Sequence, residues 1–83
     1  MKVQVRYFAS LRETLGISAE AVDTLCFDVA GLRTQLIARG GAHAECLAPG
    51  RAVRVAVNQV MAQDSTPLVP DCEVGFFPPV TGG

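Results

Sequence analysis

The chain has 83 residues, of which 49% are hydrophobic and 18% are charged, and its formal net charge is −1. This composition predicts one globular domain with a modest core, and the lack of a basic cluster argues against a nucleic-acid surface. No apolar run is long enough to span a bilayer and no signal peptide precedes the first strand pattern, so we expect a cytoplasmic protein without membrane contacts.

Alternating apolar residues open the chain. Val3, Val5 and Tyr7 lie at every second position, which is the period of a β-strand. Residues 10–15 are predicted to form a short helix that Ser10 caps and the following glycine closes.

A second extended stretch is predicted over residues 20–27, where β-branched and aromatic residues are frequent. Asp28 is then a good N-cap for the main helix, which ends before the glycine pair 40–41. The apolar face of this helix comprises Val29, Leu32, Leu36 and Ile37. Residues 42–51 are expected to form a loop with one helical turn at residues 44–47, and His43 is expected to be a surface residue of that loop.

The last third of the chain returns to strand patterns around a turn at residues 58–59. The expected strands cover residues 51–57, 60–61 and 73–77. One main helix can cover one face of a single mixed sheet, which predicts an α+β fold. We expect the domain to comprise residues 1–77 and a flexible diglycine tail to comprise residues 78–83.

Strand parity predicts an apolar surface beside this tail. If the apolar residues of the first strand point into the core, Phe8 points outward or leaves the strand edge. If Val74 and Phe76 point inward, Phe77 points outward. Two exposed phenylalanines would form a patch that a partner protein can bind. The alternative is that both rings are covered by loops.

The side chains offer no evident active site. Cys26, Cys46 and Cys72 are odd in number and widely spaced, so a disulfide or a metal site is not expected. The single histidine has no nearby nucleophile, and the carboxylates are scattered, mostly at solvated or capping positions. The chemically distinctive group is instead the C-terminal carboxylate of Gly83. A glycine end fits a narrow channel, although small residues at a terminus can also be incidental.

Two segments together resemble a known family. The closing residues 76–83, Phe-Phe-Pro-Pro-Val-Thr-Gly-Gly, and the opening residues 5–9, Val-Arg-Tyr-Phe-Ala, are similar to those of molybdopterin synthase small subunits, which are ubiquitin-like sulfur carriers. The resemblance extends over the whole chain, through Leu11-Arg12-Glu13, Val57-Asn58-Gln59 and the approach to the last strand. It implies the ubiquitin-like β-grasp fold.

The resemblance also implies a chemistry. An ATP-using, ubiquitin-activating-like adenylyltransferase would adenylate Gly83, and sulfur would replace AMP to give a thiocarboxylate. The large synthase subunit would then receive the tail, and sulfur would pass to cyclic pyranopterin monophosphate to form the molybdopterin dithiolene. The chain itself would bind no cofactor stably, and two small and two large subunits would form a heterotetramer.

The implied site residues follow by position. Gly83 would be the reactive end, and Gly82 would let the end of the tail pass through a narrow channel. An apolar contact surface would comprise Phe8, Met61 and Phe77. The remaining tail residues would contact the partner: Pro78, Pro79, Val80 and Thr81.

Three other functions remain compatible with the sequence. A ubiquitin-like modifier would join Gly83 to a lysine, and a carrier of another pathway, such as thiamine biosynthesis, would use the same activation chemistry. A passive interaction domain with an idle tail is the third. The closing octet favours the molybdopterin carrier over all three.

Overall fold

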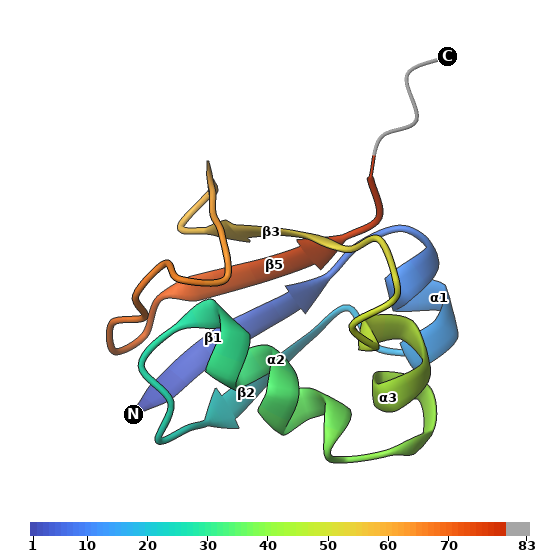
Figure 1. Cartoon of the computed structure of the whole chain (residues 1–83), viewed down its shortest axis with the longest axis horizontal. Helices are drawn as coiled ribbons and strands as arrows, with labels where there is room; N and C mark the ends of the chain where they lie inside the picture. The colour runs from blue at the N-terminus through green and yellow to red at the C-terminus, as the bar shows by residue number, and fades with distance from the viewer. Residues whose placement is uncertain (80–83) are drawn as a thin grey trace.

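Five strands form one mixed sheet in a computed structural model that describes residues 1–79. In sheet order the strands are β2 (Ala19–Asp23), β1 (Lys2–Tyr7), β5 (Glu73–Phe77), β3 (Arg54–Val57) and β4 (Val60–Met61). The central neighbours β1 and β5 are parallel, and every other pair is antiparallel (Figure 1). Because the first and last strands meet at the centre, the chain end after β5 leaves from the middle of the sheet rather than from its edge.

Three helices accompany the sheet: α1 (Ser10–Leu15), α2 (Val29–Ile37) and α3 (Gly41–Leu47). The α2 helix begins as predicted, since the Asp28 carboxylate accepts a hydrogen bond from the Gly31 backbone N–H at 2.9 Å. Leu32 and Leu36 on this helix are fully buried. These contacts confirm the predicted α+β architecture, with α2 as the main helix on one face of the sheet. Among residues 1–79, no helix has the length and hydropathy needed to cross a membrane.

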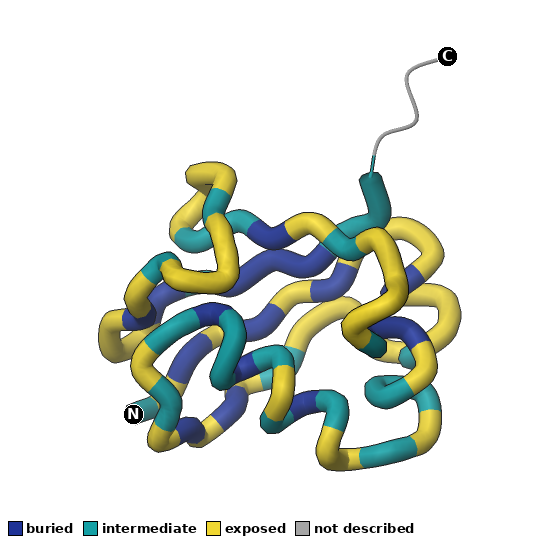
Figure 2. The backbone as a smooth tube through the Cα atoms, in the orientation of Figure 1, coloured by how far each residue is buried: buried dark blue, intermediate teal, exposed yellow. Residues whose placement is uncertain are grey.

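The core lies between the helices and one face of the sheet. Val3, Val5 and Tyr7 are at most 1% exposed on β1, and Val74 and Phe76 are equally buried on β5. Figure 2 shows this buried track along the two central strands. The strand parity predicted from the sequence is therefore confirmed for both strands.

Two helix predictions were wrong. Ser10 does not cap α1: the capping position is Ala9, whose φ of 53° lies in the left-handed region, and no side-chain hydrogen bond caps the helix. Residues 41–47 form the helix α3, which contains the turn expected at residues 44–47 but begins three residues earlier, where a loop was expected. Gly40, with φ of 74°, allows the sharp change of direction between α2 and α3. The α3 helix buries Cys46 and Leu47, which supplies the packing that its weak local signals lack.

Two strands are shorter than predicted. The β2 strand ends at Asp23 because Asp23 pairs with Lys2, where β1 begins, and the chain beyond it has no further strand to pair with. The β3 strand begins only at Arg54, because the Arg33 guanidinium binds the carbonyl groups of Leu47, Ala48 and Arg51 and holds this connection in a turn. The predicted turn at 58–59 is confirmed, since both residues have positive φ.

Candidate functional site

The face of the sheet opposite the helices carries an apolar patch, which we call the open-face patch: Phe8, Ala56, Met61, Gly75 and Phe77. Phe8 is 40% exposed and Met61 is 56% exposed, while Phe77 is half-buried. Phe8 and Phe77 line one hollow of about 380 Å³, together with Ala56 and Gly75 at its floor. The structure thus brings together the two phenylalanines that strand parity predicted to point outward.

Glycine at position 75 allows the Phe8 ring to lie flat across the sheet. A Cβ atom at this position would approach the Cε2 atom of the Phe8 ring to 3.0 Å. The Arg6 guanidinium carbon lies 5.5 Å from the centre of the same ring, within cation–π distance. Arg6 is also paired with Glu73 at 3.3 Å. The ring is therefore held between a small floor residue and an ion pair.

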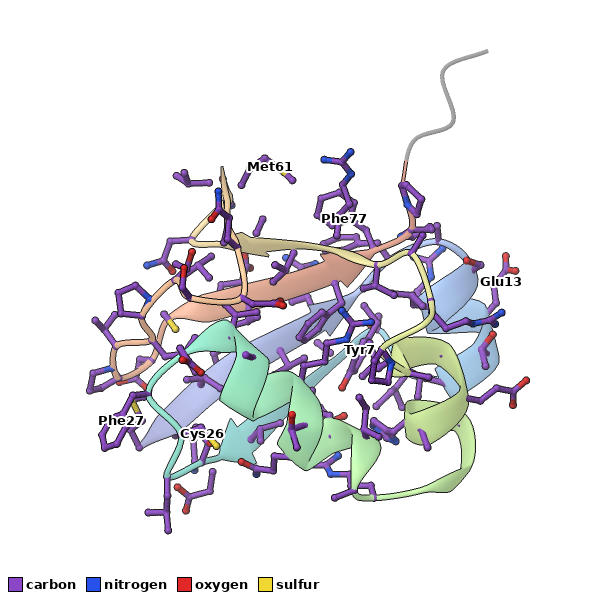
Figure 3. The ribbon with its side chains drawn as sticks, viewed as in Figure 1. Tyr7, Glu13, Cys26, Phe27, Met61 and Phe77 are labelled. Atoms are coloured by element: carbon purple, nitrogen blue, oxygen red, sulfur yellow. The ribbon has the colours of Figure 1, made fainter. Side chains whose placement is uncertain are left out.

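Met61 lies one strand further from the two rings. It pairs with Ala56 across β3 and β4, which places it on the same face of the sheet. Figure 3 shows the side chains of Met61 and Phe77 on the side of the sheet away from α2. Met61 does not line the hollow between Phe8 and Phe77. It extends the open-face patch toward the sheet edge.

The remaining predicted site residues lie at or beyond the end of β5. Pro78 lines a separate hollow of about 270 Å³ beside Ser10, Leu11 and Arg51, and Pro79 is half-buried. Val80, Thr81, Gly82 and Gly83 lie outside the described residues, so their predicted roles stay predictions. The partner-binding roles of Phe8, Met61 and Phe77 also stay predictions.

A polar cluster on the covered side of the sheet was missed from the sequence. The Tyr7 hydroxyl donates to Glu20 Oε2 at 2.8 Å, and His43 Nε2 lies 3.0 Å from the same oxygen. Arg39 pairs with the other oxygen, Oε1. The prediction that His43 is a surface loop residue is wrong, since its side chain is 19% exposed and lies on α3. The general interpretation of the acids as solvated or capping residues is likewise wrong for Glu20.

The cluster shifts two pKa values. Burial raises the pKa of Glu20, but hydrogen bonds from Arg39, His43 and Tyr7 outweigh this effect and lower the pKa to about 2. Burial and the hydrogen bond to Glu20 raise the pKa of Tyr7 far above its usual value. Glu20 is thus ionised and Tyr7 neutral near pH 7. The cluster joins β1 and β2 to the end of α2 and to α3, which is a structural role.

Thiols and potential metal ligands are dispersed over residues 1–79. The three cysteines are free, Cys46 and Cys72 are buried, and burial raises the pKa of the Cys46 thiol. Within residues 1–79, no group of three or more His, Cys, Asp or Glu side chains could hold a metal ion. The open-face patch includes Phe77, the last residue of β5, so it lies beside the point where the chain continues into Pro78 and Pro79.

Comparisons with known proteins agree with this geometry. The ThiS family model matches residues 5–83. A molybdopterin synthase sulfur carrier subunit of Escherichia coli K12 is 38% identical over 81 residues, which are 98% of this chain and 99% of the relative. A solved structure described as putative molybdopterin converting factor subunit 1 from Pyrococcus furiosus is 28% identical, with a TM-score of 0.79 over 96% of this chain and 99% of that one.

A second solved structure shows a related chain in an assembly. It is a complex of subunits 1 and 2 of the molybdopterin-converting factor from Helicobacter pylori, and the matching chain is 26% identical with a TM-score of 0.69. The match covers 100% of both chains. Together these structures confirm the predicted ubiquitin-like β-grasp fold.

Proposed function

This chain belongs to the ThiS family, and from that premise we propose that it is the sulfur carrier and small subunit of a molybdopterin synthase. One observation carries the proposal: the similarity to a molybdopterin synthase sulfur carrier subunit extends over 98% of this chain. The open-face patch supports it, because a carrier without a reaction centre needs a surface through which another protein receives its tail.

The proposed chemistry takes place at the carboxylate of Gly83. A carboxylate is a poor electrophile, so the activating adenylyltransferase first joins it to AMP from ATP and releases pyrophosphate. A sulfur nucleophile at the sulfide level then attacks the acyl carbon, the bond to the AMP oxygen breaks, and a thiocarboxylate remains. In the synthase, the thiocarboxylate sulfur forms a bond to a carbon of cyclic pyranopterin monophosphate, and a bond from that carbon to oxygen breaks. Water then hydrolyses the acyl–sulfur bond, which returns Gly83 to a carboxylate and leaves the sulfur on the product. A second thiocarboxylate chain supplies the second sulfur of the molybdopterin dithiolene in the same way.

The proposed partners follow from this cycle. The large synthase subunit binds the open-face patch and receives the tail, and two small and two large subunits form the heterotetramer. The complex solved for the Helicobacter pylori relatives supports a large-subunit partner. The adenylyltransferase uses ATP, so the carrier itself needs no stably bound cofactor. We place the cycle in the cytoplasm.

Intact-mass measurement tests the proposal. The purified chain is incubated with the adenylyltransferase of the same organism, ATP and sulfide, and a chain without Gly83 serves as the matched control. We expect the full chain to gain the mass difference between one sulfur and one oxygen, and the control to remain unchanged. The modified chain should then convert cyclic pyranopterin monophosphate when the large subunit is added.

Three results would contradict the proposal. Covalent adducts on lysines of other proteins, without a thiocarboxylate, would indicate a protein modifier. An unchanged mass under conditions in which a known carrier is converted would indicate a passive interaction domain. A thiocarboxylate that forms but is not used by the large subunit would indicate a carrier of another pathway.

A further inference from the structure

A cation lies inside the open-face patch. Arg54 pairs directly with Phe77 across β3 and β5, so both side chains project from the same face of the sheet. Arg54 and Met61 also line a common hollow of about 270 Å³. Arg54 is therefore a neighbour of two of the three large apolar residues of the patch, Phe77 and Met61.

Arg54 differs from the other arginine on this face. Arg6 already has a carboxylate partner in Glu73, at 3.3 Å. Asp64 lines the hollow that Arg54 and Met61 share, but among residues 1–79 no carboxylate lies within ion-pair distance of Arg54, and Arg54 is exposed. In the free chain, water therefore solvates the Arg54 charge.

Docking of a partner protein changes the hydration of Arg54. A protein that covers Phe77 and Met61 removes water from the space between them, where Arg54 lies. A charge that loses its hydration without gaining a partner strongly weakens an interface, whereas a carboxylate placed in bidentate contact compensates for the loss. The exposed arginine therefore favours a bound surface that supplies an acceptor over one that does not.

We infer that Arg54 is a specificity-determining residue of the open-face patch, and that the large subunit presents a carboxylate to it between the pockets for Phe77 and Met61. This inference rests on the proposed function, because it names the chemistry of the surface that receives this carrier. An apolar or basic surface at the same place would be rejected, so Arg54 would select one large subunit from others of similar shape.

The test compares Arg54→Met with Lys2→Met by kinetic binding measurements against the large subunit of the same organism. Lys2 is an exposed cation that begins β1, so its replacement matches the chemical change at the end of the strand remote from Phe8. We expect Arg54→Met to raise the dissociation rate at least about tenfold, as loss of one member of a buried charge pair does. The association rate should change little. Lys2→Met should bind like the wild type, and Arg54→Lys, which keeps the charge but cannot form the bidentate contact, should recover only part of the affinity.

Whether Arg54→Met dissociates faster or more slowly than the wild type decides whether the inference holds. If the bound surface supplies no carboxylate, the methionine removes an unpaired charge, and Arg54→Met dissociates as slowly as the wild type or more slowly. That result overturns the inference while leaving the proposed function intact. A change confined to the association rate at low salt would also overturn it, because it would show a charge at the rim. A wild-type chain that does not bind the large subunit would overturn the proposed function and the inference together.

Discussion

The two faces of the sheet are built from the same strands, but the side chains on one face are packed inside the chain and those on the other face are partly exposed to solvent. On the covered face, Phe76 is 1% exposed and stacks near Tyr7, with ring centres 6.3 Å apart. The next residue, Phe77, lies half-buried on the open face beside Phe8. One of two adjacent phenylalanines thus packs in the core and the other lies on the open face, because successive side chains of a strand point to opposite faces.

The charged groups of the two faces also differ, because those on the covered face have partners within the chain, whereas Arg54 on the open face has none among residues 1–79. The covered face completes its contacts internally, since Glu20 binds Tyr7, Arg39 and His43. On the open face, Arg54 has no carboxylate partner within residues 1–79. A face that is complete in the free chain contributes stability, whereas an incomplete face is suited to binding. Substitutions on the two faces should therefore separate stability from function.

The largest expected effect lies on neither face. Deleting Gly83 should abolish sulfur transfer in a reconstituted synthase assay, because the reacting carboxylate would no longer reach its position. Adding one residue after Gly83 should be equally disabling. Thermal unfolding of both variants should match the wild type. Appreciable activity in either variant would contradict the assignment of the reactive group.

The covered face is tested by Phe76→Ala. Truncation of this buried ring should destabilise the chain by about 3–5 kcal/mol, the usual effect for a buried phenylalanine. Denaturant unfolding measures the change, with Phe77→Ala as the neighbouring control. An unchanged midpoint for Phe76→Ala would break the comparison, because it would show that the core does not depend on this ring.

The open face is tested by Phe77→Ala. Aromatic anchors in an interface commonly contribute about 2 kcal/mol or more, so affinity for the large subunit should fall by at least tens-fold. The isolated chain should remain folded. Phe27→Ala is the matched control, because Phe27 is 83% exposed and lies away from the open-face patch (Figure 3). Loss of stability with unaltered binding would place Phe77 functionally with the core.

The smallest expected effect concerns pH. Since the pKa of Glu20 falls from 4.5 to about 2 in the folded chain, its contribution to stability is present above pH 4.5 and is lost as the pH falls toward 2. We expect a loss of about 1–2 kcal/mol over this interval, less than the full shift implies because water screens the partly exposed carboxylate. Unfolding of wild type and Glu20→Gln should converge as the pH is lowered. Parallel pH profiles for the two chains would show that the cluster does not stabilise the fold.

Periodic features of the fold could be predicted from the sequence. Alternation in β1 and β5 fixed which residues enter the core, and Asp28 fixed the start of α2. The same alternation predicted that Phe8 and Phe77 point away from the core. These features depend on neighbours within a few positions, which is why a single sequence reveals them.

Features that depend on distant contacts could not be predicted. Glu20 and His43 are 23 positions apart, and neither has local context that indicates the other. The α3 helix was missed because it begins at a glycine pair, with Gly40 as its cap and Gly41 as its first residue, and its packing supplies the missing local preference. The setting of Arg54 emerges only when β3, β4 and β5 are placed in register. The need for glycine at position 75 likewise becomes evident only when the neighbouring Phe8 ring is placed against it.

The parallel pairing of the first and last strands also governs when the protein can fold during synthesis. Arg6 and Glu73, which form an ion pair across this junction, are separated by 67 positions. Contacts of such long range form slowly, because a large loop must close first. The sheet can therefore close only after the ribosome has released β5, which is the central strand. Phe8 and Phe77 come together to face a partner only once β5 has paired with β1.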